Sequence, residues 1–215
     1  MRKVDYLVVG LGNPGSKYTN TRHNIGWMVA ARLCERFKKP VMPMGNLYML
    51  SSMRIHGKLT LCALPTTYMN RSGEAVKSLC KEFDIPIEHV IVIVDEYNFD
   101  VGRVHAKKGG GDGGHNGIAS IIYEMESLDY IKLRCGIGKG FESGEMVDYV
   151  LSNFLLEEEE DKEKMIEKAV DAIVHIIKAG PRRAFSEINS GKIWEPKKVK
   201  PKEETKEENK KAEDE

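Results

Sequence analysis

One histidine, one aspartate and two asparagines carry the chemistry that this sequence could perform. Asn13 and His23 follow one apolar run, Asn70 precedes a helical repeat, and Asp95 follows a second apolar run. Histidine titrates near neutral pH, so His23 can act as a general base. A carboxylate can orient the imidazole, and amides can donate to a developing oxyanion. The set as a whole is typical of attack by water on a carbonyl.

Each of these residues also has a purely structural explanation. Asn70 could cap a helix, and Asp95 could simply begin a loop. His23 could be an exposed residue in a loop whose helix is capped by Asn24. Taken singly, these alternatives stay open; it is the combination that favours catalysis.

A glycine motif follows the first apolar run but does not fit a dinucleotide site. Residues 10–15 satisfy G-x-G-x-x-G. In a nicotinamide or flavin site the helix begins at these glycines, so that its N–H groups face the pyrophosphate. Here the polar stretch 16–23 intervenes, and the helical repeat begins near Ile25. The motif therefore predicts a turn at the carboxyl edge of a sheet.

A second glycine-rich segment, residues 109–117, has six glycines in nine positions and follows Lys107 and Lys108. Glycines allow close approach of backbone N–H groups to a ligand, and neighbouring lysines suit phosphate. The segment lacks the G-K-[ST] ending of a nucleotide-binding P-loop. A flexible linker is the alternative, and His115 with Asn116 directly before an apolar helix speaks against it.

The elements that must position these residues alternate between strands and helices. Short β-branched runs predict strands, and apolar spacing of three and four predicts helices. This order predicts an α/β fold, a single three-layer domain with a twisted mixed β-sheet flanked by helices. The expected strands are 6–10, 48–55, 59–64, 90–94, 103–107 and 130–137, and the expected helices are 25–37, 72–83, 116–125, 146–154, 157–179 and 182–188.

Charge divides the chain into a body, residues 1–194, and a tail, residues 195–215. The tail holds seven lysines, eight acidic residues and two prolines, and it is too polar to bury a core. We expect it to be disordered. The whole chain has 33 basic and 33 acidic residues and a formal net charge of zero, which excludes a broadly basic nucleic-acid binder but allows a local basic patch.

Neither a metal site nor a membrane segment is predicted. The six histidines show no paired-ligand spacing, and the four cysteines have no C-x-x-C pattern and lie in apolar stretches. Reduced thiols suit a cytoplasmic protein. The apolar run 6–9 is too short for a signal peptide or a membrane span.

Three motifs together closely resemble the bacterial-type peptidyl-tRNA hydrolases. They are residues 7–26, 65–70 and 113–117, and the resemblance extends from about residue 3 to residue 189. It implies a monomeric, metal-independent esterase with no cofactor and with the peptidyl-tRNA hydrolase-like fold. Such an enzyme hydrolyses the ester between a peptide and tRNA, and so recycles tRNA from peptidyl-tRNA that stalled ribosomes release.

The resemblance also implies roles for individual residues. His23 matches the catalytic base, Asp95 the carboxylate that orients it, and Asn13 the amide that distinguishes blocked from free aminoacyl-tRNA. Lys107 and Arg134 match a basic pair that holds the tRNA 5′ phosphate. The remaining positions expected to bind the substrate or the tRNA are Tyr18, Tyr68, Met69, Asn70, His115 and Asn116.

The sequence departs from the family pattern after Asp95. Residues 96–102 include Tyr97 and Phe99, where the family usually has an apolar, proline-containing turn. This leaves the catalytic carboxylate in place but alters the loop that follows it. A non-catalytic RNA-binding relative of the same fold is the alternative function, and an activity assay separates the two.

Overall fold

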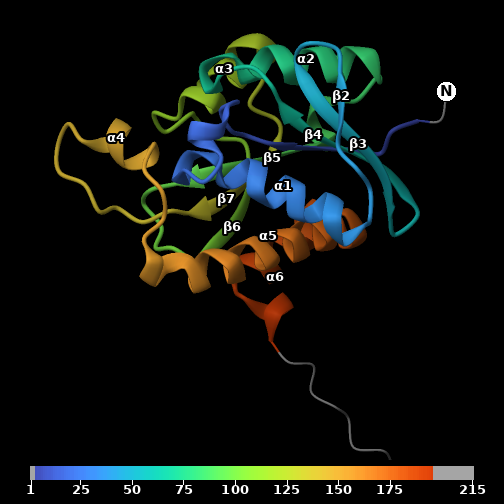
Figure 1. Ribbon diagram of the computed structural model, residues 1–215. Helices are drawn as coiled ribbons and strands as arrows, with labels where there is room; N and C mark the ends of the chain where they lie inside the picture. The colour runs from blue at the N-terminus through green and yellow to red at the C-terminus, as the bar shows by residue number, and fades with distance from the viewer. Residues whose placement is uncertain (1–2, 196–215) are drawn as a thin grey trace, which may run out of the picture.

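A seven-stranded mixed sheet runs through the computed structural model, which describes residues 3–195 (Figure 1). The strand order is β2-β3-β4-β1-β5-β7-β6. The four strands β4, β1, β5 and β7 are parallel, whereas β2, β3 and β6 pair antiparallel with their neighbours. The bounds are β1 Tyr6–Gly10, β2 Met42–Met44, β3 Tyr48–Ile55, β4 Lys58–Pro65, β5 Val90–Glu96, β6 Val104–Lys108 and β7 Ile131–Gly136.

Helices cover both faces of this sheet and make the fold three-layered (Figure 1). One buried cluster joins the sheet to α1 (Ile25–Arg36), α5 (Glu159–Ala179) and α6 (Pro181–Asn189). The other joins its opposite face to α2 (Ser72–Glu82) and α3 (Asn116–Met125). The predicted α/β architecture with a mixed sheet is therefore confirmed.

The two central strands carry continuous apolar runs, 6–10 in β1 and 90–94 in β5, because helices cover both of their faces. All five residues of β1 are buried, as are the first six of β5. Such strands read as continuous apolar runs without alternation. Because β4, β1 and β5 are parallel, the segments that follow them emerge at one edge of the sheet. Open α/β sheets bind ligands at this carboxyl edge.

The structure corrects two of the predicted elements and adds a third. The strand predicted at 90–94 continues to Glu96, because Asp95 and Glu96 extend the ladder with β7. The helix predicted at 146–154 is the short α4, Met146–Val150. Beyond it the backbone pairs elsewhere: Arg22 N–H donates to the carbonyl of Ser152. The three-residue strand β2, which is fully exposed, was not predicted from its sequence.

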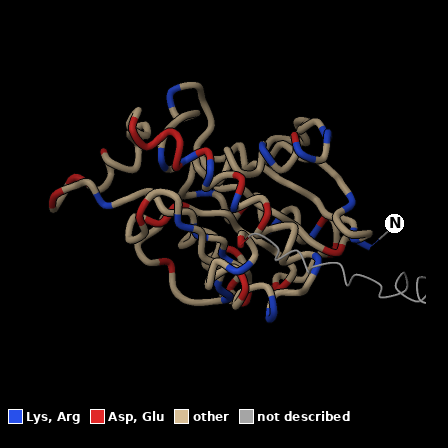
Figure 2. Tube along the Cα trace, turned by 90° about the horizontal axis from the view of Figure 1, so that it is seen from below, with Lys and Arg blue, Asp and Glu red and all other residues tan. Residues whose placement is uncertain are grey.

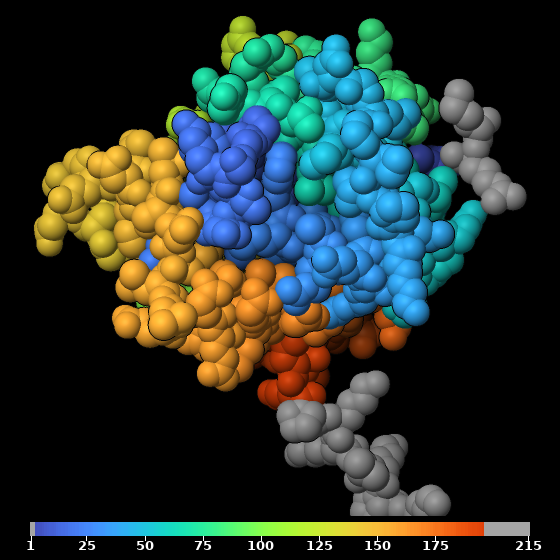
Figure 3. Space-filling view, in the orientation of Figure 1, coloured from blue at the N-terminus to red at the C-terminus, as the bar shows by residue number. Residues whose placement is uncertain are grey.

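The charged residues of the body are mixed in sign. Basic and acidic segments alternate along the traced chain seen from below (Figure 2). The segment that carries α4 stands out at one side of the molecule (Figures 1 and 3). Within residues 3–195, no helix combines the length and apolar character needed to cross a membrane. Apart from Glu195, the tail predicted at 195–215 lies outside the described residues.

We predict that Gly26→Ala destabilises the protein. Gly26 is the second residue of α1 and lies against the sheet. A Cβ there would lie 2.5 Å from the backbone N and O of Leu11 and 2.6 Å from the carbonyl oxygen of Ile93. Because backbone cannot move aside as a side-chain tip can, we expect the free energy of unfolding in urea to fall by about 1–3 kcal/mol.

Gly111→Ala is the matched control for this change. Its Cβ would meet no heavy atom within 4 Å, so the free energy of unfolding should stay within about 0.5 kcal/mol of wild type. Equal unfolding midpoints for Gly26→Ala and wild type would show that α1 does not need this close approach.

Candidate active site

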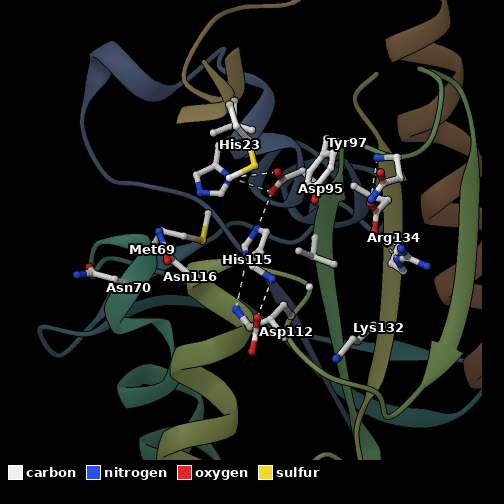
Figure 4. A pocket seen from close by; sticks show the side chains of 18 of the residues that line it. His23, Met69, Asn70, Asp95, Tyr97, Asp112, His115, Asn116, Lys132 and Arg134 are labelled. Carbon is white, nitrogen blue, oxygen red and sulfur yellow. Dashed lines mark hydrogen bonds and ion pairs between the residues drawn. The ribbon is translucent and has the colours of Figure 1, made fainter. Parts of the chain in front are cut away.

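A cavity of about 530 Å³ opens at the carboxyl edge of the sheet. Figure 4 shows His23, Asp95 and His115 at its centre, with Met69, Asn70 and Asn116 on one side and Lys132 and Arg134 on the other. The parallel strands deliver these groups from distant parts of the sequence. Apolar side chains from the α4 segment also line the cavity: Met146, Val147, Val150 and Leu151.

His23 and Asp95 form the hydrogen-bonded pair that the sequence predicts. His23 Nδ1 lies 3.0 Å and 3.1 Å from the two carboxylate oxygens of Asp95. A carboxylate at neutral pH only accepts, so Nδ1 carries the proton and donates it. The other ring nitrogen, Nε2, is therefore the basic one. His23 lines the cavity, and both residues are buried.

His115 donates to the same carboxylate from the other side. The N–H groups of Gly117 and Ile118 donate to its Nδ1 over 3.1 Å and 3.3 Å, so His115 caps α3 through its ring. The remaining proton must lie on Nε2, which is 2.8 Å from Asp95 Oδ1. Both ring nitrogens of His115 are thus engaged. The ring thus acts on Asp95, and the predicted contact of His115 with the substrate or the tRNA stays a prediction.

Charge at this centre follows from burial and pairing. Burial disfavours ionised Asp95, but the two histidines outweigh that cost, and its pKa lies well below the usual range. Burial also disfavours protonated His23, and the adjacent carboxylate more than offsets it, so the His23 pKa is raised. His23 thus remains able to take a proton near neutral pH.

Asn13 is held so that one of its amide groups remains for the cavity. Asn24, which is fully buried, accepts from the backbone N–H of Asn13 and donates to its carbonyl oxygen. The side-chain oxygen of Asn13 accepts from the N–H of Met69 at 2.8 Å. Its Nδ2 has no partner among residues 3–195 and is the donor that Asn13 can offer the cavity, which it lines.

The other predicted residues on this side of the cavity lie at or just before the starts of two helices. Tyr68, Met69 and Asn70 come from the segment after β4, and Asn116 is the first residue of α3. Asn70 and Asn116 are exposed at the cavity, whereas Met69 is buried beneath them. Their position supplies N–H donors beside His23.

Three cations lie on the opposite side of the cavity, on β6 and β7. Lys107 and Lys132 pair in the strand register, and Arg134 lies two residues further along β7. Arg134 donates to Glu96 through Nε at 2.8 Å and also through Nη2. Lys132 donates to the carbonyls of Gly110 and Gly111 at 2.5 Å and 2.8 Å. Within the described residues neither lysine has an ion-pair partner, and Lys107 also lacks the carbonyl contacts that hold Lys132.

Two functional residues were missed by sequence reasoning. Asn24 was considered only as a helix cap, although its side chain holds Asn13. Lys132 sits within a buried strand, 2% exposed, and holds the glycine-rich loop. Burial and the charges of Lys107 and Arg134 lower its pKa to about 8. A charged residue in an otherwise apolar run was the available signal.

Of the predicted residues, Tyr18 is the one that does not line the cavity. It lies in a short 3₁₀ turn, residues 16–18, on the loop between Asn13 and His23. The ammonium of Lys17 lies 4.7 Å from its ring centre. Its predicted contact with the substrate therefore stays a prediction.

His23, Asp95 and His115 are better suited to hold protons than to bind a metal ion. Donor atoms of His23, Asp95 and His115 lie within 4.8 Å of one another, as metal ligands do. A metal on His115 Nε2 would displace the proton that this nitrogen must carry while Nδ1 caps α3. A metal on His23 Nδ1 would likewise displace its hydrogen bond to Asp95.

Comparison with known proteins identifies the family of this chain. A family model described as peptidyl-tRNA hydrolase matches residues 7–198. The chain belongs to the peptidyl-tRNA hydrolase family. Peptidyl-tRNA hydrolases from Fervidobacterium nodosum and Clostridium tetani are 42% and 38% identical to it, over 87% and 86% of this chain and 97% of each relative. The chain is thus an enzyme of the hydrolase class, as its residues predicted.

A solved structure of the family has the same fold. The crystal structure of the peptidyl-tRNA hydrolase from Acinetobacter baumannii is 30% identical and superposes with a TM-score of 0.82. The match covers 88% of this chain and 97% of that one. The mixed sheet and its flanking helices are therefore those of the peptidyl-tRNA hydrolase family.

We predict that Asp95 sets the pKa of His23. Because the carboxylate favours the charged imidazole and burial opposes it, Asp95→Asn should lower the His23 pKa, measured by NMR titration of its ring protons. His175, which pairs with Glu187 away from the cavity, serves as an internal control. If the His23 pKa does not change in Asp95→Asn, the carboxylate does not control the base.

Proposed function

We propose that this enzyme hydrolyses the ester between a peptide, or an N-blocked aminoacyl group, and tRNA. The observation that carries the proposal is the His23 ring, whose Nδ1 is fixed on Asp95 and whose Nε2 is left as a base beside amide donors. Such an arrangement is what attack by water on a neutral ester requires. Membership in the peptidyl-tRNA hydrolase family supports this substrate.

In the proposed reaction, His23 Nε2 removes a proton from a water molecule as its oxygen attacks the ester carbonyl. Negative charge moves to the carbonyl oxygen, where amide N–H groups of Asn13, Asn70 and Asn116 donate. The tetrahedral intermediate then breaks its bond to the ribose oxygen, which takes the proton from His23. The products are a free peptide carboxylate and tRNA with an intact terminal hydroxyl.

Asp95 contributes in two ways to this proposal. It keeps the proton of His23 on Nδ1, so that Nε2 faces water as a base, and it stabilises the imidazolium that forms. His115 holds Asp95 in place from the opposite side. Each amide donor aimed at the oxyanion is worth roughly 3 kcal/mol in such sites.

The 5′ phosphate of the tRNA is proposed to lie across the cavity from the amides. Lys107, which has no ion-pair partner within residues 3–195, is the strongest candidate to bind the 5′ phosphate. Arg134 adds a second cation, although Glu96 takes two of its donors. Phosphate contacts position an RNA without reading its sequence. Tyr68, which is 57% exposed, provides a stacking surface for the terminal end.

The proposal extends to how the enzyme works in the cell. Residues 1–194 would act as a monomeric catalytic unit in the cytoplasm, without metal or cofactor, and residues 195–215 as an appended tail. The enzyme would recycle tRNA from peptidyl-tRNA released by stalled ribosomes. A non-catalytic RNA-binding relative is the alternative, and turnover of an N-blocked aminoacyl-tRNA by the full chain decides between them.

Replacing the base His23 should abolish turnover and leave the affinity for tRNA nearly unchanged. His23→Ala removes the proton acceptor, so kcat on N-blocked aminoacyl-tRNA should fall by about 10²–10⁴-fold. The affinity for deacylated tRNA, measured by filter binding, should stay within about twofold because no proposed phosphate contact is lost. Near-normal turnover by His23→Ala would remove His23 from the role of base.

The 5′ phosphate gives a test of Lys107. Wild-type enzyme should have a lower KM for 5′-phosphorylated than for 5′-hydroxyl substrate, and Lys107→Gln should remove most of that difference. Lys108→Gln is the matched control, because Lys108 is exposed and paired with Asp129 at 2.8 Å. If Lys108→Gln and Lys107→Gln behave alike, the phosphate is bound elsewhere.

A further inference from the structure

A second group of cations lies beside the cavity, around the ring of Phe99. The guanidinium carbons of Arg103 and Arg134 lie 4.1 Å and 4.5 Å from the centre of this ring. Aromatic rings attract guanidinium groups through their quadrupole and hold them in place. Arg134 also lines the cavity, whereas Arg103 and Phe99 lie outside its lining. Phe99 thus holds Arg103 next to Arg134, and the positive charge on this side of the cavity extends beyond its lining.

His105 lies at the middle of this group. It pairs with Arg134 in the β6–β7 register, and its ring centre is 5.6 Å from that of Phe99. Burial and the positive charges of Arg134, Arg103 and Lys107 lower its pKa. Its Nδ1 is buried and has no hydrogen-bond partner. The His105 ring is therefore surrounded by more positive than negative charge: three cations face it, and Glu96 is the acid that opposes them.

The acidic groups near this cluster leave Arg103 unpaired. Glu96 pairs with Arg134, and its carboxylate raises the His105 pKa less than the cations lower it. Arg103 is exposed and has no ion-pair partner within the described part of the chain. A cation without a counter-charge, held by an aromatic ring, is suited to bind an anion from solution.

The backbone under the ring is fixed. Gly138 N–H donates to the carbonyl of Phe99, and Gly136 N–H donates to that of Arg103. A Cβ at Gly136 would lie 2.1 Å from the carbonyl oxygen of Asp100, so the turn packs directly on β7. The turn that carries Phe99 and Arg103 is therefore fixed against the end of β7, the strand that carries Arg134.

We propose that Arg103, held by Phe99 beside Arg134, binds a backbone phosphate of the acceptor stem of the tRNA substrate. This inference rests on the proposed function, since it places the stem next to the end that is hydrolysed. A double-stranded RNA end presents successive phosphates, and a guanidinium can bind one of them with two parallel N–H donors. The contact adds affinity for the stem and does not act in bond cleavage.

The salt dependence of tRNA binding tests this contact. Each lost phosphate contact reduces the slope of log Kd against log salt concentration by about one unit. Arg103→Gln in the full chain should show that reduction with deacylated tRNA, and a several-fold weaker Kd at low salt. Arg182→Gln on α6, which removes another exposed arginine, should match wild type. Equal slopes for Arg103→Gln and wild type would overturn the proposal.

Two variants separate the charge of Arg103 from its position. Arg103→Lys retains a cation but not the planar donor pair, so it should recover part of the affinity. Phe99→Leu retains Arg103 and removes the ring, so its loss of affinity should be smaller than that of Arg103→Gln. If Phe99→Leu binds tRNA like wild type, the ring does not position the arginine.

A short substrate distinguishes the stem from the reaction centre. An N-blocked aminoacyl ester of the trinucleotide CCA has no stem, so Arg103→Gln and wild type should hydrolyse it with equal kcat/KM. An equal loss on both substrates would mean that Arg103 acts at the reaction centre, contrary to the proposal. If wild-type enzyme hydrolyses neither substrate, the proposed function fails, while the salt slopes still report on the phosphate contact.

His105 gives an independent spectroscopic readout. A phosphate bound between Arg103 and Arg134 offsets the cations that lower the His105 pKa, so NMR titration should show this pKa rising when deacylated tRNA is added. The charged groups that face His105 are Arg103, Lys107, Arg134 and Glu96. A His105 pKa that tRNA does not raise would contradict the phosphate site.

Discussion

The buried carboxylate of Asp95 is the interaction on which the site depends. An ionised carboxylate out of water is costly unless hydrogen bonds and positive charge compensate it. Here two histidine N–H groups do so, one from His23 before α1 and one from His115 at the start of α3. Asp95 itself lies in the central strand β5. One charge thus joins three elements that are remote in sequence.

The same arrangement separates the tasks of the cavity. The amides of Asn70 and Asn116 come from the starts of helices on one side, and cations come from β6 and β7 on the other (Figure 4). An ester carbonyl needs donors and a base, whereas an RNA end needs positive charge. In the proposed reaction the ester would lie against the amides and the 5′ phosphate against the cations, with β5 between the two groups.

Sequence patterns predicted most of the fold because a buried strand or helix requires apolar residues at a regular spacing along the chain. The runs 6–10 and 90–94 are continuously apolar, and the helices from 25, 72 and 116 repeat at helical spacing. The errors lie where pairing decides an element's length. β5 extends through Glu96 because β7 lies beside it, and α4 ends early because the chain then pairs with the segment at Arg22.

The sequence by itself determined which groups could react: a histidine base, a carboxylate and several amides, spaced in motifs that mark the family. Only the tertiary structure decided how each is used. No local sequence pattern predicts that Asn24 holds Asn13 or that Lys132 holds the glycine-rich loop. Nor does one predict that both ring nitrogens of His115 are hydrogen-bonded. The physical reason is that protons and charges are assigned by partners, and those partners meet only when parallel strands bring their carboxyl ends together.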